Sequence, residues 1–126
     1  MIPEDLRYTA EHEWVAGDAG EPVRVGITHF AQEALGDIVY VQLPELHTAV
    51  KAGEAFGEIE STKSVSEIYA PLSGTVVEVN DLLADAPELI NTDPYDAGWL
   101  VKIAPDDYAD VEALLSPEAY RELTER

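Results

Sequence analysis

A short pattern that occurs twice restricts the folds open to this chain. Residues 36–41 read Gly-Asp-Ile-Val-Tyr-Val, and residues 74–79 read Gly-Thr-Val-Val-Glu-Val, a shift of 38 positions. Both segments are rich in β-branched residues, which favour strands. Each leads through a loop to another predicted strand, over 55–60 and 98–103. Two similar β-units predict a pseudo-symmetric flattened sandwich or barrel, whereas a chance match between short strands is the alternative.

Other segments predict hairpins. Residues 14–15 and 23–27 are expected to pair through a turn over 17–20. The polar stretch 61–64 lies between two predicted strands, so we expect it to form a hairpin tip. The fold class is therefore mainly β.

Short helices are expected at two places. Thr28 is a candidate N-cap for a helix over 29–35, which is followed by glycine. Near the C-terminus, acidic residues precede apolar residues at helical spacing, and Ser-Pro-Glu at 116–118 begins a second helix with Tyr120 and Leu123 on its apolar side. We expect these C-terminal helices to cover a sheet surface.

Length and net charge restrict the number of domains and the kinds of binding partner. The length fits a single domain, residues 1–126, with the C-terminal helices from about 107 packed on it. The chain has 26 acidic and 7 basic residues, a net charge of -19, which argues against nucleic-acid or anionic-membrane binding. Partners with basic patches are favoured, and solubility alone is the other interpretation of the charge. We expect a monomer.

Two absences in the sequence bear on chemistry and location. There is no cysteine, so any thiol chemistry would have to come from an attached cofactor. The first residues are acidic without an apolar stretch, and nowhere do 18 apolar residues run together. These features predict a cytoplasmic protein.

The usual signatures of an active site are not found. His12-Glu13 begins like a zinc-protease motif, but Ala16 stands where the second histidine ligand is required. The three histidines are scattered, so no metal site is expected. No set of residues resembles an acid, a base and a nucleophile, and we expect a protein that is not an enzyme.

Lys63 is one of three lysines and lies in the predicted hairpin tip. Its neighbours there are small, and Glu60 and Glu67 flank the tip as possible recognition charges for a basic enzyme surface. A primary amine at such a tip is accessible to a modifying enzyme. The other interpretation is that the lysine only solvates a turn, and spacing alone does not decide between the two.

Residues 60–74, Glu-Ser-Thr-Lys-Ser-Val-Ser-Glu-Ile-Tyr-Ala-Pro-Leu-Ser-Gly, closely resemble the lipoylation segment of the glycine cleavage system H-protein family. The resemblance covers roughly residues 6–123. It departs at His47, where glycine is usual, at Thr62, where valine is common, and at Glu67, where aspartate is common. The other stretches that follow the family in order are 7–15, 26–32, 35–39, 91–95, 98–99 and 102–103.

The resemblance implies a barrel-sandwich hybrid of two β-sheets with the modified lysine on a hairpin tip and helices at the C-terminus. It implies lipoate joined to Lys63 as an amide, with Glu60, Ser61 and Glu67 in lipoylation recognition. It also implies that Glu13 contacts the amino end of the loaded arm in a surface cleft; otherwise Glu13 is an exposed acid beside a core tryptophan.

The implied function is that of a carrier rather than a catalyst. The arm would take the aminomethyl group from a pyridoxal-phosphate glycine decarboxylase and deliver it to a tetrahydrofolate-dependent aminomethyltransferase. A dihydrolipoamide dehydrogenase would reoxidise it, and lipoyl- or octanoyl-transferring enzymes would attach it. Tethering keeps the intermediate at a high effective concentration.

Three other functions are considered. One is a different swinging-arm carrier, although Thr62 and Ser64 are not the methionines of a biotinyl site and isolated lipoyl domains lack the stretch at 7–15. A second is a relay that donates lipoyl groups to the carriers of 2-oxoacid dehydrogenases. A third is an unmodified acidic binding module.

Overall fold

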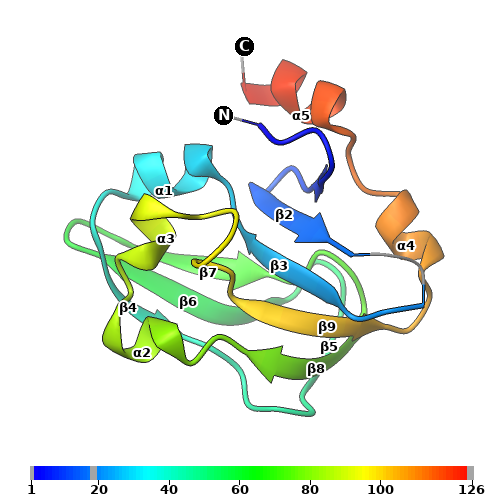
Figure 1. Cartoon of the computed structure of the whole chain (residues 1–126), viewed down its shortest axis with the longest axis horizontal. Helices are drawn as coiled ribbons and strands as arrows, with labels where there is room; N and C mark the ends of the chain where they lie inside the picture. The colour runs from blue at the N-terminus through cyan, green and yellow to red at the C-terminus, as the bar shows by residue number, and fades with distance from the viewer. Residues whose placement is uncertain (1, 18–19, 125–126) are drawn as a thin grey trace.

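The computed structural model describes residues 2–17 and 20–124 and consists of two antiparallel sheets with short helices (Figure 1). The sheets share no strand within these ranges, and they do not close into a barrel, so the expected two-sheet fold is confirmed. The three-stranded sheet has the order β4 (Ile38–Gln42), β6 (Ala55–Ser61) and β7 (Val65–Tyr69). The six-stranded sheet has the order β1 (Arg7–Tyr8), β2 (Glu13–Ala16), β3 (Val23–Ile27), β9 (Val101–Pro105), β8 (Gly74–Val79) and β5 (Ala49–Val50).

The main hydrophobic core joins the inner faces of both sheets. Apolar side chains alternate along the strands, as expected for sheets with one buried face. The three-stranded sheet contributes Ile38, Ile59 and Ile68, and the six-stranded sheet contributes residues that include Val25, Val76, Val101 and Ile103.

The internal repeat is confirmed by the strand pairing. We call β4 with β6 the first β-unit and β8 with β9 the second, because in each unit the repeated segment pairs antiparallel with the strand it leads to. The register shifts between Ile38 and Tyr40 in the first unit and between Val76 and Glu78 in the second. These bulges lie 38 residues apart, at equivalent steps of the two copies. The match in sequence is therefore a match in structure.

Helix α1 (His29–Leu35) forms where the sequence predicted it. The Thr28 hydroxyl accepts a hydrogen bond from the Ala31 amide at 3.2 Å, which satisfies one of the free N–H groups at the helix start. Gly36, with φ of 86°, ends the helix in a conformation that other residues rarely adopt. Two further short helices, α2 (Leu82–Asp85) and α3 (Leu89–Thr92), were not expected from the sequence.

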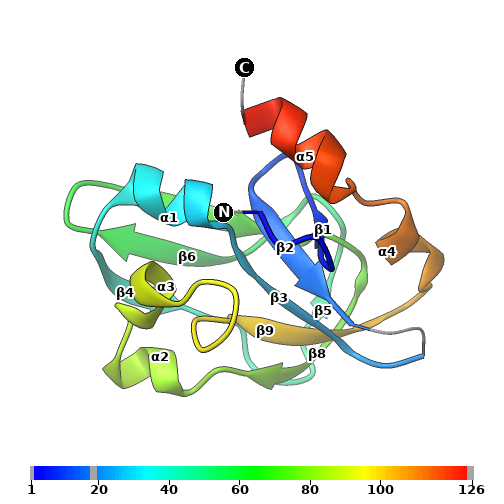
Figure 2. The same cartoon turned by 45° about the horizontal axis from the view of Figure 1, so that its top comes forward.

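The C-terminal helices are α4 (Ala109–Glu112) and α5 (Pro117–Thr124), and α5 lies over β1 (Figure 2). The predicted start of α5 is confirmed, since the Ser116 hydroxyl accepts from the Ala119 amide at 3.2 Å. Tyr120 is fully buried and stacks on Tyr8, with ring centroids 4.6 Å apart. Leu123, three residues further along the helix, remains 36% exposed.

The hairpin of β2 and β3 is also confirmed, although Asp18 and Ala19 of its turn lie outside the described residues. His47 has a φ of 69°, so the turn after β4 does need the conformation that glycine adopts freely. Within the described ranges, no helix is long and apolar enough to cross a membrane.

Candidate functional site

Lys63 lies exposed at the tip of the hairpin formed by β6 and β7, as predicted. Ser61 organises this tip. Its amide donates to the Ser64 carbonyl at 2.8 Å, and its hydroxyl accepts from the amides of Lys63 at 3.3 Å and Ser64 at 3.1 Å. Because Ser61 is only 6% exposed, it stabilises the turn through these hydrogen bonds and offers little surface to a partner.

A second support comes from the end of α1. The Thr62 amide donates to the Asp37 carbonyl at 3.0 Å. The Lys63 Cε lies 3.3 Å from the position that a Cβ atom would occupy at Gly36. The stem of the lysine therefore lies close to the backbone of Gly36.

Asn91, from α3, holds the segment on which the lysine rests. Its amide nitrogen donates to the Gly36 carbonyl at 2.8 Å and to Gln32 Oε1 at 2.9 Å, and its amide oxygen accepts from the Ile38 N–H at 2.9 Å. The sequence placed residues 91–95 in a family-like stretch but indicated no role for Asn91. The polar Asn within a family-like stretch was the available signal.

Glu60 and Glu67 lie on the outer face of the three-stranded sheet. Glu60 is paired in register with Tyr40 and Val65, and Glu67 is paired with Glu58. All of these side chains are exposed. Among the described residues, the glutamates of this face form no ion pair. The predicted recognition charges are thus available to a partner.

Glu13 is not the exposed acid that one interpretation of the sequence proposed. It is only 2% exposed. Its carboxylate accepts hydrogen bonds from the Thr9 hydroxyl at 2.7 Å and from the Tyr69 amide of β7 at 3.1 Å. Burial raises its pKa to about 7, against the lowering effect of these two bonds. Glu13 therefore joins the two sheets and changes its charge near neutral pH.

Glu13 also lines a cleft of about 320 Å³. Tyr69 and Pro71 line one side, and Leu114 and Leu115, between the C-terminal helices, line another. A carboxylate at the edge of an otherwise largely apolar cleft is suited to an amino group carried on an apolar chain. Glu60, Ser61, Lys63 and Glu67 do not line this cleft, so the structure does not gather the predicted site residues in one place.

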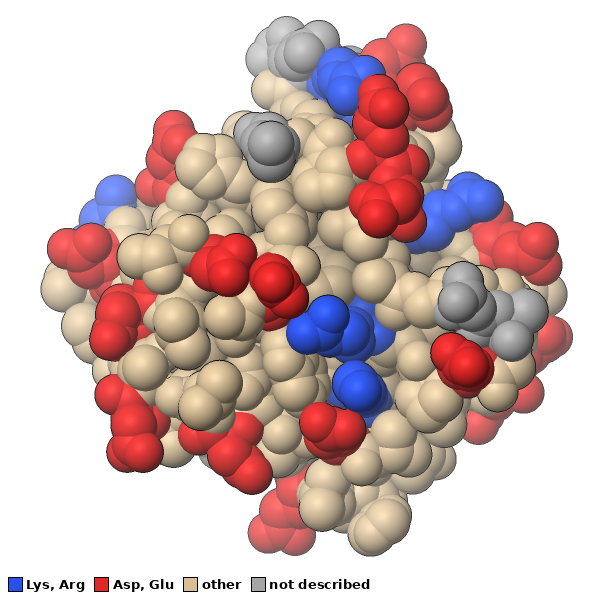
Figure 3. All heavy atoms as spheres, in the orientation of Figure 1, with Lys and Arg blue, Asp and Glu red and all other residues tan. Residues whose placement is uncertain are grey.

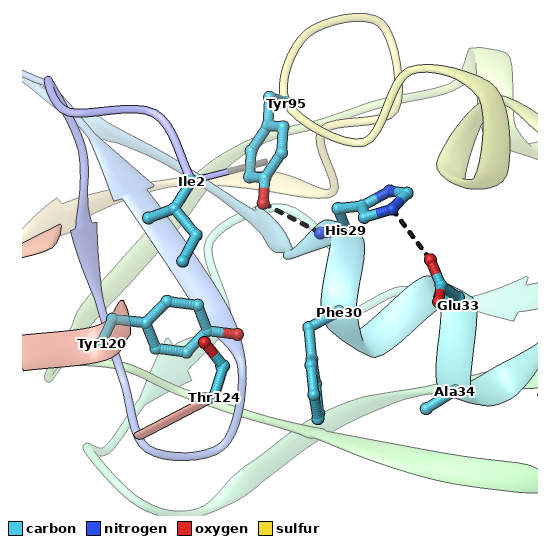
Figure 4. Close-up of a pocket in the computed structure, with 8 residues that line it drawn as sticks. All are labelled: Ile2, His29, Phe30, Glu33, Ala34, Tyr95, Tyr120 and Thr124. Atoms are coloured by element: carbon cyan, nitrogen blue, oxygen red, sulfur yellow. Dashed lines mark hydrogen bonds and ion pairs between the residues drawn. The ribbon is translucent and has the colours of Figure 1, made fainter. Parts of the chain in front are cut away.

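A second recess, of about 340 Å³, lies between α1 and α5 (Figure 4). Figure 4 shows Phe30 and Tyr120 on opposite sides of it, and His29 bonded through Nε2 to Glu33 at 2.9 Å. The Tyr120 hydroxyl is held at 2.7 Å from both Thr28 Oγ1 and His12 Nδ1. His12 is thus a packing and hydrogen-bonding residue, as its sequence context indicated, and none of the predicted site residues lines this recess.

Negative charge surrounds these features. Figure 3 shows carboxylates around most of the visible face, with a few cationic side chains gathered near its middle. Arg24 and Lys102 both lie over the Trp99 ring, at 5.5 and 5.9 Å from its centroid. No group of three metal-ligating side chains occurs in the part of the chain that the structure describes.

Comparisons with known proteins agree with this geometry. The model of the family described as Glycine cleavage H-protein matches residues 6–126. A glycine cleavage system H protein from Anaeromyxobacter sp. (strain K) is 59% identical over 124 residues, which cover 98% of this chain and 96% of the relative. Its counterpart from Bacillus subtilis (strain 168) is 54% identical, with 98% and 97% covered.

The solved structures give the same result. The crystal structure of a glycine cleavage system H protein from Mycobacterium marinum superimposes with a TM-score of 0.90 at 50% identity. It covers 99% of this chain and 100% of that one. Sequence, fold and hairpin tip therefore lead to one conclusion: this chain belongs to the glycine cleavage H-protein family.

Proposed function

We propose that this protein carries a lipoyl group on Lys63 and conveys the aminomethyl group of glycine between the enzymes of glycine cleavage. The observation that carries the proposal is the exposed Lys63 on an ordered hairpin tip, in a chain of the H-protein family. Its partners would be the glycine decarboxylase, the aminomethyltransferase, dihydrolipoamide dehydrogenase and the enzymes that attach lipoate.

The residues around Lys63 fit an attached arm. Thr62 and Ser64 are small and exposed, so they leave room on both sides of the amine. Within the described part of the chain, Lys63 forms no ion pair that attachment would break. Acylation removes the positive charge of the amine, and at a solvated tip this leaves no buried group without a partner.

The lipoyl group supplies, when bound, the sulfur chemistry that a chain without cysteine lacks. The protein contributes position. Ser61 and the Asp37 carbonyl fix the base from which the arm extends, so successive enzymes meet the arm at a defined point.

Glu13 is our candidate for the contact with the amino end of the loaded arm. Its carboxyl group borders an apolar cleft and changes charge near neutral pH, so an ammonium group there would favour the ionised form. Glu13→Gln keeps the size of the side chain and one acceptor oxygen but cannot become negatively charged. We expect the loaded arm of this variant to lose its aminomethyl group faster, while the amount of lipoate attached is unchanged.

Intact mass after incubation with a lipoate–protein ligase, lipoate and ATP tests the attachment. The protein should gain one lipoyl group, and Lys63→Arg should gain none. Lys51→Arg and Lys102→Arg are matched controls that should be modified like the unchanged protein. Label on either of those lysines, or none on Lys63, would contradict the assignment.

A further inference from the structure

The outer face of the three-stranded sheet is uncovered next to the lysine. Strand register places its side chains in two rows across β4, β6 and β7, and all of them are exposed. The row nearer the tip holds Tyr40, Glu60 and Val65, and the next row holds Gln42, Glu58 and Glu67.

Three large apolar side chains are exposed on or beside these rows. Val39 is 49% exposed, Tyr40 56% and Val65 57%. The bulge in β4 is the reason that two consecutive residues, Val39 and Tyr40, both face solvent. Single exposed apolar residues are ordinary, but three of them around one functional tip indicate a binding surface.

The charges of the same face also lack a counterpart. Glu58 and Glu67 are directly opposite each other in register, an arrangement that destabilises a sheet. Glu60 lies between Tyr40 and Val65. No cation among the described residues pairs with these three glutamates. A partner with lysine or arginine side chains around an apolar patch would complement both features.

We propose that this tip face, made of Val39, Tyr40, Val65, Glu58, Glu60 and Glu67, docks the enzyme that attaches the lipoyl group to Lys63. The inference rests on the proposed function. The complementary surface of that enzyme would be an apolar patch with a basic rim.

The reach of the reacting atoms selects this enzyme over the others. In attachment, the neutral Lys63 Nζ attacks the acyl carbonyl of lipoyl adenylate, the amide C–N bond forms, the C–O bond to AMP breaks, AMP leaves and the amine proton passes to solvent. The enzyme must therefore enclose the lysine itself, and Val65 is only two residues away. Enzymes that act later meet the far end of the arm and do not have to cover the tip.

The test measures kcat/KM for acylation by a purified lipoate–protein ligase with lipoate and ATP. We expect the double variant Tyr40→Ser, Val65→Ser to lose at least tenfold. The control is Val77→Ser, because Val77 is a valine of β8 that is 37% exposed and lies outside the tip face. It should stay within twofold of the unchanged protein, and circular dichroism should show both variants folded.

Two further measurements separate the outcomes. Converting Glu58, Glu60 and Glu67 together to glutamine should flatten the dependence of kcat/KM on salt, since screening weakens charge pairing. The double variant, driven to full lipoylation with excess ligase, should support glycine decarboxylation within twofold of the unchanged protein.

Unchanged acylation of the double variant would overturn the docking proposal, and so would a loss confined to the decarboxylase step, which would assign the face to that enzyme. Neither result touches the proposed function as long as the unchanged protein is modified on Lys63. Failure of that modification would instead remove the proposed function itself.

Discussion

After its bulge, the first β-unit places Tyr40 opposite Glu60, whereas the second places Glu78 opposite Lys102. In the second unit the pair is an ion pair, with Lys102 Nζ 3.5 Å from Glu78 Oε1, and Lys102 also lies over the Trp99 ring. In the first unit the tyrosine is exposed and the glutamate has no ion-pair partner among the described residues. The same strand pairing therefore carries two different surfaces. In the second unit the opposite charges pair with each other, whereas in the first unit Tyr40 and Glu60 stay free to contact a partner beside Lys63.

The largest expected effect comes from breaking the strand pairing of either unit. A Cβ at Gly57 would lie 2.5 Å from the Gln42 carbonyl oxygen of β4, and a Cβ at Gly74 would collide with the Ala104 carbonyl oxygen of β9. We expect Gly57→Ala and Gly74→Ala each to lower the free energy of unfolding by about 3 kcal/mol in urea titrations.

Gly53→Ala is the control for these two variants. Gly53 has a φ of 85° but open space around it, so its loss should be only about 1 kcal/mol. If either Gly57→Ala or Gly74→Ala were as mild as this control, the close approach of the strands in that unit would be wrong.

The next effect concerns Glu13, which joins β2 to β7 and so links the sheets that hold the two units. Its folded pKa, about 7, lies above the ordinary value of 4.5, so the folded state favours the protonated form. The stability it confers is complete below pH 4.5 and is lost as the pH rises through 7. Relative to Glu13→Gln, the protein should lose up to about 3 kcal/mol between pH 4.5 and pH 8.

Urea titrations of both proteins across this pH range measure that difference, and Glu54→Gln, an exposed glutamate elsewhere in the chain, is the control. A constant difference between Glu13→Gln and the unchanged protein would show that folding does not raise the pKa of Glu13.

Surface substitutions should have smaller effects on the free energy of unfolding, and these effects should differ between the two units. Lys102→Met removes the partner of Glu78 and one cation over Trp99, and we expect a loss of about 1 kcal/mol that shrinks at high salt. Tyr40→Ser, in the first unit, should change the free energy of unfolding by less than about 0.5 kcal/mol. Equal losses in thermal or urea unfolding would mean that the open surface also serves stability.

The smallest effect is expected at His47, where the loop after β4 of the first unit contacts β8 of the second. His47 holds a φ of 69° while its amide donates to the Val76 carbonyl at 2.7 Å. His47→Gly should relieve the strain of the left-handed backbone and raise the free energy of unfolding by about 0.5 kcal/mol. The gain is small because glycine also loses more backbone entropy on folding, which offsets part of the relieved strain. His47→Ala keeps the strained backbone and should not raise the free energy of unfolding. If His47→Ala were stabilised as much as His47→Gly, the cause would be loss of the imidazole ring and not relief of backbone strain.

Local signals carried most of what could be predicted from the sequence. Thr28 before α1 and Ser116 before α5 act through amides three residues away, so their patterns are visible in a short window. The repeat predicted the two β-units, and the family-like stretch indicated Lys63 and its tip.

The remainder depends on contacts that no short window contains. Glu13 is buried and accepts a hydrogen bond from the amide of Tyr69, 56 residues later. Asn91 supports Gly36 from 55 residues away. Leu123 follows a helical pattern but stays partly exposed, whereas Tyr120 of the same helix is buried against Tyr8. Each depends on how separate elements meet, which spacing along one element does not specify.

The order β4-β6-β7 leaves the three-stranded sheet with two edges, and an open edge can recruit strands from other molecules. The bulge in β4 interrupts the regular ladder at one edge, and on β7 the charged Glu67 faces solvent at the other. These features disfavour the addition of a strand from another molecule to a sheet whose outer face is uncovered beside Lys63. The bulge in β4 therefore opposes edge-to-edge pairing with another molecule at this end of the sheet.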